Sequence, residues 1–230
     1  MLTTFIVAQP PALSATRIIM LPGAYQSAGD FMVAGFDSAI RARCLALDLM
    51  LVTPALTHVR DRNWLARLHD EVVSPTRAAG HTLWIGGISL GAFMALRFAA
   101  QYPAQVDGLC LIAPYLGSRV IAAEIARHQS LKSWQPGEFG EDDDERHIWR
   151  YVRGLEAPPP RVFLGLGTED RFADTQGLLA GALPASSTRR IPGAHEWPVW
   201  RQLWAHFLDR HDVALTGAHE QQRIDDRSAP

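Results

Sequence analysis

The segment Thr82–Gly91 reads TLWIGGISLG and joins two kinds of secondary structure. Its first part, Thr82–Ile88, is a short apolar run typical of a buried strand. The segment Leu90–Tyr102 that follows is rich in Ala, Leu and Phe and is stopped by Pro103, which predicts a helix. Ser89 therefore stands at a sharp turn from a strand into a helix, inside the pattern G-x-S-x-G.

A serine on such a turn is a candidate nucleophile. The turn requires a strained backbone at Ser89, and Gly87 and Gly91 let the strand and the helix approach each other. The hydroxyl is lifted clear of the sheet, and the backbone N–H of Leu90 faces the place where an oxyanion would form. The pattern alone occurs by chance in many proteins, but its position between a strand and a helix makes it considerably more specific.

Apolar runs alternate with helix-length amphipathic segments along the rest of the chain. This alternation predicts an α/β fold with a mostly parallel central sheet and helices on both faces. The other predicted strands are Arg17–Leu21, Arg43–Asp48, Gly108–Ala113, Arg161–Gly165 and Thr188–Ile191.

Two regions depart from this alternation. The segment Gly117–Pro160 joins two predicted strands and contains no convincing strand itself. Because such long connections in compact domains are usually functional or disordered, we expect it to form a small cap or lid. Helical stretches are expected around Val120–His128 and Arg146–Arg153, and the acidic run Glu141–Glu145 between them is expected to be a solvated loop. Residues 214–230 contain few large apolar residues and are expected to form a disordered tail. Residues 1–213 are then expected to form a single domain.

A serine nucleophile needs a histidine base and a carboxylate that orients it. His195 lies in a loop after the last predicted strand and before the final amphipathic helix, where open α/β sheets build their sites. For the acid, Asp170 follows the strand that begins at Arg161. Glu169 and Asp174 are nearby alternatives, and all three carboxylates could instead cap the helix that begins near Phe172.

These features together resemble the α/β-hydrolase superfamily, over roughly residues 15–210. The segment Gly87–Gly91 is similar to the family's nucleophile elbow, and Ser89, Asp170 and His195 follow the family's chain order. The resemblance implies a serine hydrolase of the esterase or thioesterase type that works through an acyl-enzyme and needs no cofactor or metal. A catalytically silent binding protein, an acyltransferase and a C–C hydrolase remain alternatives on the same fold.

The resemblance also implies an oxyanion loop after an early strand. The family usually has His-Gly there, whereas this chain has Pro22-Gly23, so the second oxyanion donor is expected to be the Ala24 N–H. Pro-Gly could also be a simple turn. Four aromatic side chains near the expected site are predicted to line the substrate pocket: Tyr25, Trp134, Trp149 and Trp197.

Composition narrows the possible partners and compartment. Of the 230 residues 47% are hydrophobic and 20% are charged, with a formal net charge of −2, which argues against nucleic acid and anionic lipid as partners. A small acyl substrate is expected, and the protein is expected to be a cytoplasmic monomer or homodimer without a membrane span. Cys44 and Cys110 lie in apolar runs and predict buried thiols, with a disulfide as the alternative. No dinucleotide, P-loop or H-E-x-x-H zinc motif is found.

Overall fold

The computed structural model describes residues 2–6, 14–128, 130–155 and 160–210; the tail predicted for residues 214–230 lies outside them. Within these residues a 7-stranded sheet has the order β1-β3-β2-β4-β5-β6-β7. All neighbouring strands are parallel except that β1 pairs antiparallel with β3. The predicted α/β fold is confirmed. The strands are β1 (Leu2–Ile6), β2 (Thr16–Leu21), β3 (Leu47–Thr53), β4 (Thr82–Ile88), β5 (Gly108–Ile112), β6 (Arg161–Gly167) and β7 (Thr188–Ile191).

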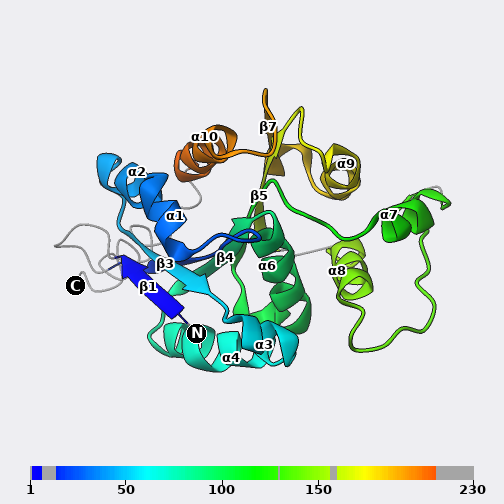
Figure 1. Ribbon diagram of the computed structural model, residues 1–230, viewed down its shortest axis with the longest axis horizontal. Coiled ribbons are helices and arrows are strands. Elements are labelled where there is room, and N and C mark those ends of the chain that lie inside the picture. Colours follow the sequence, from blue (N-terminus) through cyan, green and yellow to red (C-terminus); the bar gives the residue numbers. More distant parts are fainter. Residues whose placement is uncertain (1, 7–13, 129, 156–159, 211–230) are drawn as a thin grey trace, which may run out of the picture.

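Helices pack against both faces of the sheet (Figure 1). None in the described ranges is both long and apolar enough to cross a bilayer. The α-helices are α1 (Ala28–Val33), α2 (Phe36–Ala42), α3 (Leu56–Arg60), α4 (Trp64–Leu68), α5 (Ser74–Ala78), α6 (Leu90–Gln101), α7 (Arg119–Ala126), α8 (Asp144–Arg153), α9 (Ala173–Ala182) and α10 (Trp197–Leu208).

The core divides into two clusters because successive side chains of a strand point to opposite faces. In β2, Ile18 and Met20 join the cluster packed under α1, α2 and α10. Ile19 and Leu21 join the cluster that contains side chains of α4, α6 and α8. A strand buried on both faces reads as a continuous apolar run, which is why this sheet could be recognised from the sequence.

The strand predicted over Arg43–Asp48 is observed later in the chain, as β3 at Leu47–Thr53. Residues 43–46 form the turn and loop that follow α2, and Cys44 is exposed there with a φ of 51°. The strand continues through Asp48 because this buried carboxylate meets the Arg17 guanidinium of β2 at 3.2 Å. The prediction of a buried Cys44 is therefore wrong, whereas Cys110 is buried in β5.

Only the first part of the acidic run matches the predicted solvated loop: Glu141 and Asp142 are exposed in a turn, whereas the next three carboxylates have partners in the fold. Asp143 caps α8 by accepting a hydrogen bond from the Arg146 N–H at 3.0 Å. Asp144 pairs with the buried Arg97 of α6 at 2.7 Å, and Glu145 accepts hydrogen bonds from the backbone and hydroxyl of Ser118. These contacts fix α8 against α6, so the carboxylates at the start of α8 have structural partners.

The turn from β4 into α6 depends on Gly91. A Cβ added there would lie 2.0 Å from the Leu21 carbonyl oxygen, a distance that backbone atoms cannot accommodate. We expect Gly91→Ala to lower the free energy of unfolding by about 3 kcal/mol or more. Gly177 in α9 is the matched control, because an added Cβ meets no atom within 4 Å.

Urea unfolding followed by circular dichroism measures both variants. Gly177→Ala should raise the free energy of unfolding by about 0.5–1 kcal/mol, since alanine loses less conformational freedom in a helix. Equal stability of Gly91→Ala and the parent protein would contradict this packing of the turn.

Candidate active site

Ser89, Asp170 and His195 each follow a strand of the parallel part of the sheet. Ser89 comes directly after β4, Asp170 after β6 and His195 after β7. Because these strands run in the same direction, their carboxyl ends lie along one edge of the sheet. That edge is where open α/β folds hold their ligands.

The backbone of Ser89 is strained and tightly held. Its φ of 54° and ψ of −114° are unusual for a residue with a side chain. The Ser89 N–H donates to the Ile112 carbonyl at 3.0 Å, and the Ser89 carbonyl accepts from the Tyr115 N–H at 3.1 Å. Such strain persists only where the surrounding structure over-determines it, and it is concentrated at functional sites. The predicted turn at Ser89 is thus present in the structure.

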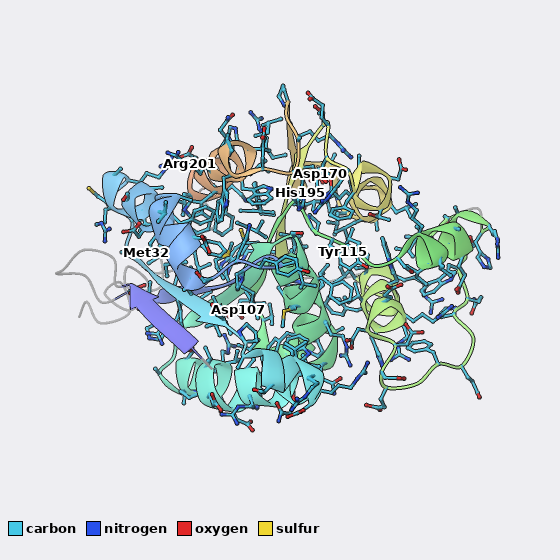
Figure 2. All side chains as sticks on the ribbon, viewed as in Figure 1. Met32, Asp107, Tyr115, Asp170, His195 and Arg201 are labelled. Carbon is cyan, nitrogen blue, oxygen red and sulfur yellow. The ribbon has the colours of Figure 1, made fainter. Side chains whose placement is uncertain are left out.

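Asp170 and His195 form a direct pair. His195 Nδ1 lies 2.8 Å from Asp170 Oδ2, and the Asp170 side chain is fully buried. An ionised carboxylate can only accept, so Nδ1 carries the proton and Nε2 of the neutral ring is left as an acceptor. Figure 2 shows the two side chains next to each other. Glu169 and Asp174, the alternative acids, are exposed instead.

The Asp170 carboxyl is held in its ionised form. Burial raises its pKa, but the hydrogen bonds from His195 and the Phe172 N–H, the polar Gln176 side chain and the charge of His195 in its protonated form outweigh burial and lower the pKa overall. Because the pKa is lower in the folded state, the ionised group stabilises the fold above its unfolded pKa. That contribution is lost as the pH falls through the lowered pKa.

Aromatic rings link Ser89 to the Asp170–His195 pair. Tyr115, whose backbone contacts Ser89, has its ring centroid 5.4 Å from that of Phe172, and Phe172 lies edge-on to His195 at 5.1 Å. Trp200 contacts the His195 ring at 5.0 Å. Within the described residues Ser89 Oγ has no hydrogen bond to His195; such bonds are often long in ligand-free enzymes.

The loop after β2 packs directly on the serine turn. A Cβ on Gly23 would lie 3.4 Å from the Ile88 carbonyl oxygen. The Gly23 N–H donates to Gln26 Oε1 at 2.9 Å, which closes the loop and leaves Ala24 exposed next to it. Leu90 is the first residue of α6, and the first N–H groups of a helix have no partner within it. Both predicted oxyanion donors therefore lie at chain segments that meet beside Ser89.

The predicted aromatic pocket needs correction. Trp134 and Trp149 are fully buried core residues, whose ring nitrogens donate to Glu124 Oε1 and to the Leu116 carbonyl. Trp197 is half-buried and packs on Phe31 and Phe36, and its ring also lies 5.1 Å from that of Trp200, which contacts His195. Tyr25 is fully exposed with a φ of 62°, so its ring forms no pocket wall in this structure.

The rings that do surround His195 were not singled out from the sequence. They are Phe172 and Trp200, with Tyr115 next in contact. A signal existed for Tyr115 and Phe172, because both follow strands at the carboxyl edge. Trp200 instead is one of several buried apolar residues of α10, so its contact with His195 could not be anticipated.

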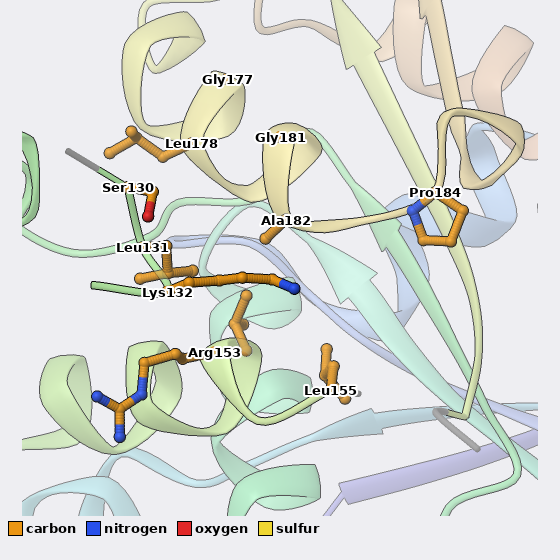
Figure 3. Close-up of a pocket in the computed structure, with 11 residues that line it drawn as sticks. Ser130, Leu131, Lys132, Arg153, Leu155, Gly177, Leu178, Gly181, Ala182 and Pro184 are labelled. Atoms are coloured by element: carbon orange, nitrogen blue, oxygen red, sulfur yellow. The ribbon is translucent and has the colours of Figure 1, made fainter. Parts of the chain in front are cut away.

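A separate cavity of about 770 Å³ lies between α8, α9 and the loop at residues 130–132 (Figure 3). Aliphatic side chains such as Leu131, Val152 and Leu178 line it, and none of the predicted catalytic or pocket residues does. Among the described residues, no cluster of three His, Cys, Asp or Glu side chains is arranged to hold a metal ion.

Comparisons with known proteins agree with this architecture. The sequence profile of the alpha/beta hydrolase family matches residues 18–229. A fluorophosphonate-binding serine hydrolase of Staphylococcus aureus, FphF, has a TM-score of 0.63 at 11% identity, with 90% of each chain covered. Est1E from Butyrivibrio proteoclasticus has a TM-score of 0.59 at 13% identity, again with 90% of each chain covered.

A monoacylglycerol lipase of Paleococcus ferrophilus has a TM-score of 0.55 at 13% identity, covering 90% of this chain and 98% of its own. No curated protein matches the sequence. At these identities the solved structures bear on the fold alone.

Proposed function

The chain belongs to the alpha/beta hydrolase family, and on this basis we propose that it is a serine hydrolase that cleaves an ester or thioester of a small acyl substrate. Ser89 is the nucleophile, His195 the general base and Asp170 the residue that orients the base. The observation that carries the proposal is the 2.8 Å contact between His195 Nδ1 and the buried Asp170, at the same sheet edge as the strained Ser89.

The first step follows from the protonation of this pair. Since Nδ1 donates to Asp170, Nε2 is the basic nitrogen and can accept the Ser89 proton while Oγ attacks the acyl carbonyl. Collapse of the tetrahedral intermediate breaks the bond to the alcohol or thiol, which leaves with the proton from Nε2. The acyl group is then bound to Ser89 Oγ as an ester.

Water completes the cycle. His195 removes a proton from a water molecule, which attacks the acyl-enzyme, and the proton returns to Ser89 Oγ as the carboxylic acid leaves. In both steps negative charge develops on the carbonyl oxygen, and we assign its stabilisation to the backbone N–H groups of Leu90 and Ala24. Every proton in this cycle is handled by the chain's own groups and water, so no cofactor is required.

Hydrolysis of matched ester and thioester series tests this proposal. Acyl chains of graded length are offered as p-nitrophenyl esters and as thioesters, with Ser89→Ala as the blank. We expect a graded preference for short or medium chains, because one methylene in an apolar pocket changes kcat/KM by roughly 10- to 200-fold. Activity confined to emulsified long-chain lipids would contradict the substrate class. No hydrolysis of any member would instead favour the silent binding protein.

A further inference from the structure

Another cavity, of about 510 Å³, lies where β7 begins, at the opposite end of that strand from His195. It is bounded by the turn Ala185–Ser187, by the first residues of β7 and by the end of α10. None of the proposed catalytic residues lines it. No carboxylate is among its described lining residues, whose polar side chains are those of Ser186, Ser187, Thr188, Arg189, His206 and Arg210.

The two arginines make this cavity positively charged. Arg189 is exposed and forms no ion pair with any described residue. Arg210 is held at the cavity because its Nη1 donates to the Val162 carbonyl at 3.0 Å, and its guanidinium lies 5.9 Å from the Phe163 ring. Cations gathered without a carboxylate among them attract anions from solution.

His206 shares the same environment. Burial lowers its pKa, and the positive charges of Arg189 and Arg43 lower it further, against the opposing charge of Asp209. Asp209 is itself paired with Arg43 at 2.7 Å and does not line the cavity. A bound anion would therefore find an imidazole ready to take up a proton beside the Arg189 guanidinium.

Three consecutive hydroxyl groups complete the lining. Ser186, Ser187 and Thr188 form no side-chain hydrogen bond with the described residues, and Thr188 Oγ1 is buried without a partner among them. A buried hydroxyl without a partner is destabilising, so valine would be the simpler residue at the start of this strand. The hydroxyls can donate to an oxyanion that enters the cavity.

We propose that this cavity is a binding site for a phosphate group, either free phosphate or a phosphate monoester. A phosphate monoester carries a charge of about −1.5 to −2 at neutral pH and three strong acceptor oxygens. Arginine forks match its geometry, and hydroxyl groups can bond the oxygens that the forks leave. A carboxylate has a single charge and two oxygens, too few acceptors for this set of donors. The site uses no catalytic residue and goes beyond the proposed function.

Titration of the full chain with sodium phosphate, at constant pH and ionic strength, tests the proposal. The reporter is the ring-proton NMR resonance of His206, which is assigned by its absence in His206→Gln. Bound phosphate should raise the pKa of His206, because a nearby anion stabilises the imidazolium. At neutral pH the resonance should move toward its protonated position and saturate with phosphate concentration.

Two neighbouring arginines give a charge-matched comparison. Arg189→Gln should weaken phosphate binding about 10- to 100-fold, since hydrogen bonds to a charged group are lost. Arg190→Gln makes the same change in net charge at an exposed residue of β7 that does not line the cavity, and it should bind phosphate as the parent protein does. Equal weakening in both variants would mean attraction by net charge alone and would overturn the site.

Thr188→Val separates phosphate binding from a structural role of the hydroxyl. It should weaken phosphate binding a few-fold while the free energy of unfolding stays the same or rises, because the hydroxyl that is removed has no partner in the described chain. Parental phosphate binding together with a lower free energy of unfolding would assign this hydroxyl to the fold and contradict its place in the site.

Glycerol 3-phosphate, in the same titration, distinguishes the two sources of the phosphate group. Tighter binding than that of inorganic phosphate would identify a monoester as the ligand, and equal or weaker binding would identify free phosphate. No saturable change at His206 with either anion, or an equal change with sodium chloride alone, would overturn the inference. Ser89→Ala should bind phosphate as the parent does, so this proposal and the catalytic one fail independently.

Discussion

Ser89→Ala should lower kcat for an acyl ester by roughly 10⁶-fold, because a nucleophile, its base and its acid act as one unit. The fold should be retained, since Ser89 Oγ makes no hydrogen bond within the described residues and the strained turn is held by backbone contacts to Ile112 and Tyr115. Initial rates on the best ester of the graded series, with circular dichroism of the same sample, measure both parts.

Ser38 of α2 is a suitable control for this variant. It is an exposed serine whose hydroxyl donates to Asp37 rather than to any residue of the proposed site, so Ser38→Ala should keep the parental kcat. Turnover of Ser89→Ala within about 10-fold of the parent would mean that the reaction uses another nucleophile or a direct attack by water.

Asp170→Asn should lower kcat by about 10⁴-fold, the usual loss when a triad carboxylate becomes an amide. An amide at this position can present an N–H to His195 Nδ1, which would move the ring proton to Nε2 and remove the base that Ser89 needs. The measurement is kcat and KM on the same ester, with the free energy of unfolding from urea denaturation.

Glu169→Gln and Asp174→Asn are the controls for the acid. Both residues are exposed near Asp170, and neither is bonded to His195. They should keep kcat within a few-fold of the parent, as surface substitutions usually do. If Asp174→Asn lost its activity while Asp170→Asn kept the parental kcat, the acid would be assigned to the wrong residue.

Much of the fold could be predicted because local sequence determines it. The strands β4 and β7 have the predicted ends: β4 is a short apolar run, and β7 is a short segment that ends at Ile191, directly before Pro192-Gly193. The positions of Ser89, Asp170 and His195 could be inferred for a related reason. Each follows a strand at its carboxyl end, and parallel strands bring such positions to one edge.

The errors arose where contacts between distant segments decide the structure. Asp48 reads as the end of a strand, yet its pairing with Arg17 of β2 lets β3 continue to Thr53. The acidic residues at the start of α8 read as a solvated run, and their partners Arg97 and Ser118 lie in other parts of the chain.

The burial of two of the predicted pocket aromatics has the same kind of cause. Whether Trp134 and Trp149 are buried depends on how α8 packs onto the core, and no local pattern in residues 117–160 reveals this packing.

Reaction with a fluorophosphonate probe tests the central claim most directly, because such probes bind covalently to an activated serine and need no knowledge of the substrate. The protein is incubated with the probe at neutral pH, its intact mass is measured, and the modified peptide is sequenced by mass spectrometry. We predict one adduct per chain, located on Ser89, which is absent from Ser89→Ala and formed much more slowly by Asp170→Asn. A folded protein that forms no adduct, or one modified at a different serine, would contradict the assignment of Ser89 as a nucleophile activated by His195 and Asp170.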